Sequence, residues 1–269
     1  MKLRVFAILL GAVVLPTIAA ADDWNGQWIS VNNNNAPMII GSGRIVSQPR
    51  SVPDFRSVET NGAEDIRVRF GPQPSLTVAA DDNLLPYLTT EVSDGVLHVG
   101  SVGSYRTRTT PQVYVTVPDL SSAVTRGSGD ITVSGVNNRE LELITKGSGS
   151  IRADGRTGML VAKVQGSGDV ELRMIQAANA DVGVYGSGDV WVGTNGTLIA
   201  RSYGSGDVHV VGNPASADVG VYGSGDAWVG TNGNLIARTY GSGDVFVTGH
   251  PASLSVSQSG SGRVIFRRG

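Results

Sequence analysis

Apolar and polar residues alternate along most of the chain, and a short glycine-rich motif interrupts the alternation at regular intervals. Around Gly186-Ser187-Gly188, the four valines of residues 182–192 all fall on one side of the two flanking runs. A period of two residues is typical of half-buried β-strands, and the Val, Ile, Thr, Tyr and Trp of these runs suit a pleated surface. The pattern therefore predicts short strands joined by turns.

The glycine-rich motif is Gly-Ser-Gly, followed in most copies by Asp, and it recurs with a period near 19 residues. Eight copies begin at positions 127, 147, 166, 186, 204, 223, 241 and 260, in steps of 20, 19, 20, 18, 19, 18 and 19 residues. A larger unit, Ala180–Ser216, returns as Ala217–Ser253. A fixed period of this length is the signature of a repeat architecture.

Each period contains a second turn, marked by Asn-Gly or by Pro, for example at Asn195-Gly196 and Asn213-Pro214. Coils of two short strands and two turns, stacked in register, would form two parallel sheets facing each other at ~10 Å. The sequence thus predicts an all-β, parallel, two-sheet β-solenoid, or β-helix. Alternation alone leaves open an antiparallel meander folded into a barrel or sandwich, but the even period favours the solenoid.

The predicted interior combines small residues before each Gly-Ser-Gly turn with larger ones after it, which would fill a thin core evenly. Gln258 and Phe266 break this pattern in the last copy, where a solenoid needs a cap. Before the repeats, strands are expected at Ile66–Phe70, Leu76–Ala79, Val96–Val99 and Gln112–Val117, with a helical turn at Leu84–Leu88. This half is interpreted as a less regular start to the same sheets, with Gly41-Ser42-Gly43 as a ninth copy of the turn.

The first 21 residues have the features of a secretory signal peptide: Lys2 and Arg4, an apolar run from Val5 to Leu15, and Ala19-Ala20-Ala21. The apolar run is too short for a membrane span, and no hydrophobic tail follows Phe266. Residues 22–38 are expected to be a polar, weakly ordered lead-in and residues 39–269 the folded domain. The predicted location is exported: periplasmic, secreted or at the cell surface.

Composition narrows the possible partners and cofactors. The sequence has no cysteine, so disulfides and thiolate metal sites are excluded and stability must come from the stacked core. Removing residues 1–21 leaves 19 Lys and Arg against 23 Asp and Glu, a net charge of −4. This mildly acidic balance without a basic cluster argues against a nucleic-acid partner. No cofactor is expected.

The turns supply one candidate for chemistry, a column of acidic residues with Ser150 and Arg263 at two of its positions. Neighbouring carboxylates could bind Ca²⁺, but Asp is an ordinary turn residue. The favoured interpretation is that each Asp caps its own turn, and that the glycines are needed because they reach positive φ without a clash. The residues assigned to the column and to the best-formed turns are Asp130, Asp169, Gly186, Gly188, Asp189, Gly204, Gly206, Asp207, Gly223, Gly225, Asp226, Gly241, Gly243 and Asp244.

The histidines and known catalytic motifs offer little. His98, His209 and His250 lie in unrelated contexts without metal-ligand spacing. No nucleophile elbow, Walker loop or paired-histidine motif occurs. Neither a metal site nor a catalytic residue is predicted.

Outward aromatic residues give the second candidate, because they recur at two positions of the period. Such columns could stack simply as stabilising ladders, or could form an apolar patch for sugar rings or a partner protein. The sequence places them in two adjacent columns on one candidate binding face: Tyr185, Trp191, Tyr203, His209, Tyr222, Trp228, Tyr240 and Phe246.

The chain also resembles a bacterial family, the putative auto-transporter adhesin, head GIN domain. The similarity runs over nearly all of residues 39–268, through the Gly-Ser-Gly-Asp turns and through Gly41–Val46, Arg50–Phe55, Ile66–Val68, Leu76–Val78, Asp81–Leu85 and Tyr114–Pro118. The resemblance implies a right-handed β-solenoid of two sheets joined by these turns, with an inferred adhesion role. It implies no catalytic residues.

Three hypotheses for function remain. The favoured one is an exported, non-enzymatic binding or adhesion module whose partner is a glycan or an envelope protein. A polysaccharide-active enzyme on a β-helix scaffold is the second, although it needs converging carboxylates that the single repeated column does not provide. The third is a structural envelope protein that self-associates through its open sheet edges.

Overall fold

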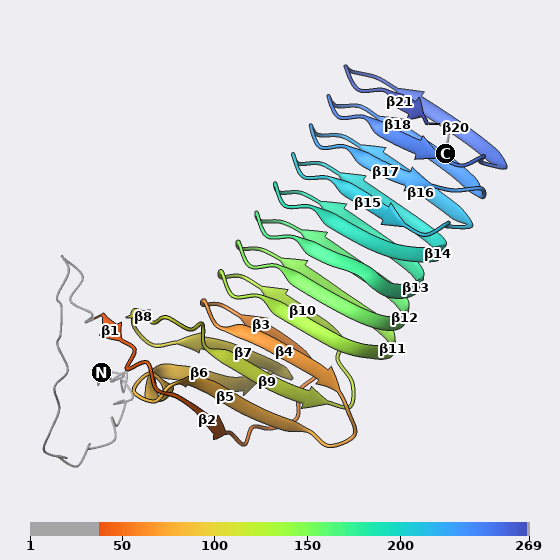
Figure 1. Ribbon diagram of the computed structural model, residues 1–269. Helices are drawn as coiled ribbons and strands as arrows, with labels where there is room; N and C mark the ends of the chain where they lie inside the picture. Colours follow the sequence, from red (N-terminus) through yellow and green to blue (C-terminus); the bar gives the residue numbers. More distant parts are fainter. Residues whose placement is uncertain (1–37, 268–269) are drawn as a thin grey trace, which may run out of the picture.

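A computed structural model describes residues 38–267 and shows a β-solenoid whose coils are stacked in one row (Figure 1). The predicted signal peptide and, apart from Met38, the polar lead-in lie outside the described residues. Between residues 38 and 267, no helix is long and apolar enough to cross a membrane.

The regular coils begin with strands that run through the second turn without interruption. These are β11 (Ile131–Thr145), β12 (Ile151–Val164), β13 (Val170–Val184) and β14 (Val190–Ser202). In later coils two separate strands replace each long one: β15 (Val208–Val211), β16 (Ser216–Val221), β17 (Ala227–Gly230), β18 (Asn234–Thr239), β19 (Val245–Thr248), β20 (Ser253–Gln258) and β21 (Val264–Phe266).

Each strand of these coils pairs in parallel with the equivalent strand of a neighbouring coil. We call the layer of strand segments before each Gly-Ser-Gly turn the pre-turn sheet, and the layer after it the post-turn sheet. Ser202 is in register with Val221 in the pre-turn sheet, and Val190 with Val208 in the post-turn sheet. The parallel register confirms the predicted two-sheet solenoid and is incompatible with an antiparallel meander here.

The N-terminal half extends the stack and then closes it. β3 (Ser57–Thr60) and β4 (Asp65–Phe70) pair in parallel with β10 (Ser122–Thr125) and β11. Beyond them β7 (Val96–Ser101) and β9 (Gln112–Val117) continue the parallel pairing, and the sheets then end in antiparallel pairs, visible at the lower end of Figure 1. The other strands and the helical turn of this end are β2 (Ile45–Pro49), β5 (Ser75–Asp81), η1 (Leu85–Tyr87) and β6 (Leu88–Ser93).

The four strands and the helical turn expected in this half are therefore confirmed, but the ninth Gly-Ser-Gly copy is not part of the stacked column. Gly43 donates its backbone N–H to Asp81 Oδ1 at 2.6 Å and has a φ of 80°. The turn leads from β1 (Ile39–Ile40), which pairs with β8 (Tyr105–Arg106), into the antiparallel strand β2. The similarity of sequence reflects a common need for a tight turn.

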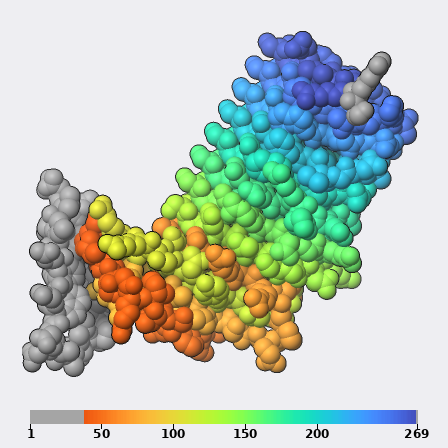
Figure 2. Space-filling view, viewed as in Figure 1, coloured from red at the N-terminus to blue at the C-terminus, as the bar shows by residue number. Residues whose placement is uncertain are grey.

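The core is a continuous layer between the two sheets, and it is less protected at its C-terminal end. The predicted inward residues of the coils up to β19 are buried, with Val210 as a half-buried exception. In the last coil, Leu254, Val256 and Phe266 are 47%, 40% and 51% exposed, although the equivalent residues one coil earlier are buried. Figure 2 shows the whole stack as an elongated body with protruding turns along one edge.

Candidate functional site

The glycines of the turns are required by close backbone contact. Gly186 and Gly188 do not have positive φ, so the expectation that they need it was wrong; of the eight copies only Gly260 does. The chains of successive turns lie so close that a Cβ on Gly188 would overlap the carbonyl oxygen of Gly168. Ser187 donates its backbone N–H to Gly166 O at 3.0 Å, which ties the two turns together.

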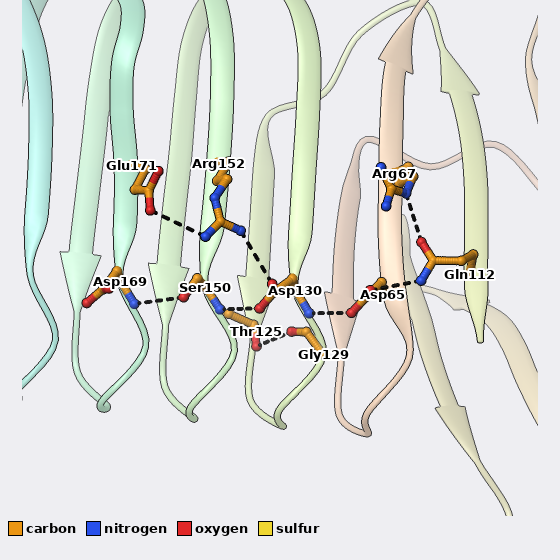
Figure 3. Close-up of polar contacts among 10 residues, drawn as sticks. All are labelled: Asp65, Arg67, Gln112, Thr125, Gly129, Asp130, Ser150, Arg152, Asp169 and Glu171. Atoms are coloured by element: carbon orange, nitrogen blue, oxygen red, sulfur yellow. Dashed lines mark hydrogen bonds and ion pairs between the residues drawn. The ribbon is translucent and has the colours of Figure 1, made fainter. Parts of the chain in front are cut away.

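The acidic column links coils, and the interpretation that each Asp caps its own turn was also wrong. Asp189 donates its backbone N–H to Asp169 Oδ1 at 2.8 Å, and Asp169 donates its own to Ser150 Oγ at 3.1 Å. Figure 3 shows the same connection continuing through Asp130 to Asp65. The ladder ends where Arg263, which has no acceptor oxygen in its side chain, donates its N–H to Asp244 Oδ1.

The structure also reveals one turn that precedes the eight Gly-Ser-Gly copies in the column and that the sequence pattern did not predict, at Gly62-Ala63-Glu64-Asp65. Thr60 Oγ1 donates to the carbonyl of Glu64, as Thr125 Oγ1 does to that of Gly129 one coil later. Beneath Glu64 the chain between β7 and β9 forms a longer connection in place of a Gly-Ser-Gly turn, so a side chain can replace the second glycine there. The buried Glu64 side chain accepts a hydrogen bond from the hydroxyl of Tyr105 at 3.0 Å. The shared Thr-x-Gly-x-x-Asp spacing was the available signal.

A second ladder follows the opposite edge, where asparagine side chains connect the second turns. Asn195 Oδ1 accepts the backbone N–H of Asn213 at 3.0 Å, and Asn213 Oδ1 accepts that of Asn232 at 2.8 Å. Asn232 in turn accepts the N–H of His250. At both edges of the solenoid, side-chain oxygens of one coil therefore accept hydrogen bonds from backbone N–H groups of the next coil.

The four tyrosines form one continuous ladder along the pre-turn sheet. The rings of Tyr185 and Tyr203 stack with centroids 5.1 Å apart and planes 11° from parallel, and the pairs that follow reach Tyr222 and Tyr240 at 4.9 and 5.3 Å. Tyr185 lies back over Gly183, where a Cβ would come within 2.7 Å of its ring. The tyrosines are 36–52% exposed.

The other aromatic column forms a second ladder along the post-turn sheet. Trp191, His209, Trp228 and Phe246 stack at centroid distances of 5.0, 4.5 and 5.2 Å. A guanidinium covers each end: Arg173 lies 4.6 Å from the Trp191 centroid and Arg267 lies 4.2 Å from that of Phe246. These rings are half-buried. His209 and Trp228 each stack between two neighbouring rings, and the outer faces of Trp191 and Phe246 are covered by the two guanidinium groups.

The predicted single aromatic face is therefore split in two, and the expectation of adjacent columns was wrong. Tyr185 points outward from the pre-turn sheet, whereas Trp191 points outward from the post-turn sheet, between the buried Val190 and Val192. Outward directions from two sheets that face each other across one core are opposite. The tyrosine ladder is the more exposed surface, and it presents ring edges and hydroxyls because interior ring faces are covered by neighbours.

His209 and the neighbouring Asp207 have shifted pKa values. Burial lowers the pKa of His209, against the opposing pull of Asp207 and Asp189. Burial likewise raises the pKa of Asp207. Ligand atoms of Asp189, Asp207 and His209 lie within 4.8 Å of one another. However, Asp189 and Asp207 already accept backbone N–H groups, and the expectation of no metal site remains a prediction.

The other histidines do not join this group. His98 Nδ1 lies 3.7 Å from Glu59 at the N-terminal end, and His250 is exposed in the last second turn. The basic and acidic side chains along the early coils form their own surface pairs, such as Arg152 with Glu171 at 3.3 Å in Figure 3.

Comparison with known proteins identifies the family and the fold. Residues 54–214 match the family described as putative auto-transporter adhesin, head GIN domain. Crystal structures of a putative adhesin and a putative lipid binding protein, both from Parabacteroides distasonis, superpose with TM-scores of 0.79 and 0.76 at 24% identity. Each covers 86% of this chain, which in turn covers 100% and 99% of theirs.

A putative adhesin from Parabacteroides merdae is similar, with a TM-score of 0.75 at 19% identity over 86% of this chain and 99% of that one. At these identities the structures support the fold alone. No curated protein matches the sequence.

Proposed function

The chain belongs to the putative auto-transporter adhesin, head GIN domain family, and we propose that it is an exported, non-enzymatic binding module of the adhesion type. The tyrosine ladder is its proposed contact surface, and a glycan or an envelope protein is its proposed partner. The observation that carries the proposal is the row of four exposed tyrosines on one flat sheet.

The tyrosine ladder suits binding because it is already ordered before a partner arrives. Each ring is held between its neighbours, so little side-chain entropy remains to be lost on contact. Tyrosine combines an apolar body with a hydroxyl that can bond a polar partner. The ladder would therefore offer one hydroxyl per coil along an apolar strip, a repeat that suits an extended partner lying along the solenoid.

A row of charged residues borders the strip and would add polar contacts. Arg201 Nη2 lies 2.7 Å from Asp218 Oδ2, and Arg238 pairs with the other oxygen of the same carboxylate. The guanidinium groups are thus held beside the rings at fixed positions. Sugar hydroxyls or backbone carbonyls of a partner could accept the remaining N–H groups.

The alternative of a polysaccharide-active enzyme receives less support from the acidic column. Glycoside hydrolysis needs two carboxyl groups arranged about one bond, one of them free to donate or accept a proton. The aspartates of the column instead each hold a backbone N–H of the next coil. This arrangement supports a structural role for them.

The binding proposal is tested by replacing the central tyrosines with serine. Tyr203→Ser with Tyr222→Ser should reduce binding to bacterial envelope fractions or to arrayed glycans at least tenfold while the chain stays folded. The matched control is Lys146→Ser with Gln165→Ser, which changes the same column in earlier coils. Equal binding by both variants and the unaltered chain would refute the tyrosine surface.

Self-association is a second candidate, because the last coil leaves apolar residues and strand edges uncovered. The exposed Leu254 and Val256 belong to β20, a strand without the lysines or prolines that protect natural sheet edges. Light scattering over a range of concentrations tests it. Leu254→Lys with Val256→Lys should shift any oligomer towards monomer, and an unaltered chain that stays monomeric would exclude this route.

A further inference from the structure

We propose that a hollow on the second-turn edge binds the oxyanion groups of an acidic polysaccharide. This site is separate from the tyrosine ladder. Only the choice of a polysaccharide as its ligand rests on the proposed function. The hollow has a volume of about 560 Å³ and is lined by parts of β12, β13, β14 and the end of β15, within the range of small-molecule sites.

A change of coil length creates the hollow. The coil from Gly166 to Gly186 has 20 residues and the next has 18, so the longer one must bulge where they meet. Leu172 pairs with Val192 and Ala177 with Thr194, which leaves the four residues 173–176 opposite the single residue Gly193. The bulge forms a ledge, and the narrower coils beside it form the floor.

Gly193 lets the ledge pack closely against the floor. A Cβ at this position would overlap the carbonyl oxygen of Ile175 in the ledge. Ile175 and Ala177 give the hollow an apolar base, and Thr194 and Asn195 add a hydroxyl and an amide. A concave apolar base with a few polar groups is the usual construction of a small-ligand site.

Two arginines give the hollow its chemistry. Arg156 and Arg173 both line it, and its lining includes neither Asp nor Glu. Among the described residues, neither guanidinium has a carboxylate within 4 Å, whereas the nearby Arg152 is paired with Asp130 and Glu171. Two uncompensated guanidinium groups at one concave site favour an anion, and their planar geometry suits carboxylate, sulfate and phosphate.

Both arginines are held in place without using up their donors. Arg156 Nε donates to Gln176 Oε1 at 3.1 Å, which leaves its terminal N–H groups available. The guanidinium of Arg173 lies over the ring of Trp191, 4.6 Å from its centroid, and it donates no hydrogen bond to another described residue, which leaves its N–H groups available. Such preorganisation reduces the entropy lost when a ligand binds.

Because the chain carries a net negative charge, an acidic polymer would have to bind at one cationic site and not through the charge of the whole protein. With residues 1–21 removed the net charge is −4, so the protein as a whole repels a polyanion. Affinity for an acidic polymer must then come from a particular cationic site. The polymer is identified by its repeated oxyanions, since the hollow opens on an edge that an elongated chain can reach.

The test measures binding of the purified chain to immobilised polygalacturonate, dextran sulfate and neutral dextran at low and high salt. We expect binding to one or both anionic polymers, weakened by salt, and none to dextran; the polymer bound distinguishes carboxylate from sulfate. Arg156→Gln and Arg173→Gln should each weaken binding at least tenfold. Arg152→Gln, which removes a paired arginine outside the hollow, should leave it unchanged.

The same variants separate this site from the tyrosine surface. Tyr203→Ser with Tyr222→Ser should retain binding to the acidic polymer, because the tyrosines lie on the other sheet. Absence of binding to both anionic polymers, or binding that Arg156→Gln and Arg173→Gln leave intact, overturns the hollow as a site. Envelope binding that Tyr203→Ser with Tyr222→Ser leaves unchanged would overturn the proposed function and leave the hollow standing.

Discussion

Asp189 Oδ1 accepts the backbone N–H of Asp207 at 2.8 Å, so a side chain of one coil completes the main-chain hydrogen bonding of the next. The same contact recurs from Asp207 to Asp226 and from Asp226 to Asp244. It satisfies a backbone donor where the chain leaves the turn and is not yet in a strand. The column therefore maintains the register of the stack at its tightest edge.

Replacing Asp189 with alanine should lower the free energy of unfolding by about 1–3 kcal/mol, because the N–H of Asp207 would lose its acceptor. Asp189→Asn is the control, since the amide keeps an acceptor oxygen at the same place. Chemical denaturation of the two variants measures the difference. Equal destabilisation by alanine and asparagine would show that charge, and not the hydrogen bond, is what matters.

Replacing Gly188 with alanine should destabilise the chain more than a simple loss of glycine would. Its backbone conformation suits any residue, but the added Cβ would overlap the carbonyl oxygen of Gly168 and force two turns apart. Gly135 provides the contrast, because it has a φ of 73° and open space around its Cβ position. Gly135→Ala should cost about 1 kcal/mol. Thermal melts in which the two variants are equal would contradict the contact argument.

These residues show how far the sequence could predict the structure. The alternation of Val182, Val184, Val190 and Val192 and the 19-residue period were sufficient for the strands, the parallel stack and the buried set. Whether a residue points into the core or outward depends only on its position along its own strand, and the sequence displays that position directly. The roles of Gly188 and Asp189 depend on the neighbouring coil, so reasoning confined to a single turn assigned the right residues to the wrong cause.

The candidate sites were less predictable for a related reason. Trp191 and Tyr185 lie six residues apart across a tight turn, and they are close in sequence although they face opposite ways. The hollow beside Gly193 arises from a difference between two coil lengths, 20 and 18 residues. That difference is visible in the sequence, but where the extra residues bulge is decided by the register of β13 against β14.

Lowering the pH should destabilise the ladder through His209. Burial lowers the pKa of His209, so the folded chain holds this proton less tightly than the unfolded chain. The stability contributed by the neutral ring is complete above the unfolded pKa of about 6.5 and decreases as the pH falls from there through the folded value. The melting temperature should therefore fall between pH 8 and pH 5.

The control for this pH effect is His209→Phe, which keeps an aromatic ring between Trp191 and Trp228 but cannot titrate. Its melting temperature should change less over the same range. The raised pKa of Asp207 acts in the opposite direction, because its folded form prefers the proton, and it does so in a more acidic range. If the melting temperatures of the unaltered chain and of His209→Phe differ by the same amount at every pH from 8 to 5, His209 is excluded as the cause.

The last prediction separates the two aromatic ladders by what each one loses. Trp191→Ala with Trp228→Ala would remove rings that are half-buried and stacked on His209, and would uncover Arg173 and Phe246. Aromatic pairs contribute about 0.5–1.5 kcal/mol each beyond the area they bury, so the double variant should lose several kcal/mol of stability. It should keep its binding to envelope material, because the tyrosines lie on the other sheet.

Thermal melting and binding measured on this variant and on Tyr203→Ser with Tyr222→Ser should give opposite patterns. If the tryptophan variant instead loses binding while its melting temperature is unchanged, the contact surface belongs to the post-turn sheet and the tyrosine assignment is wrong.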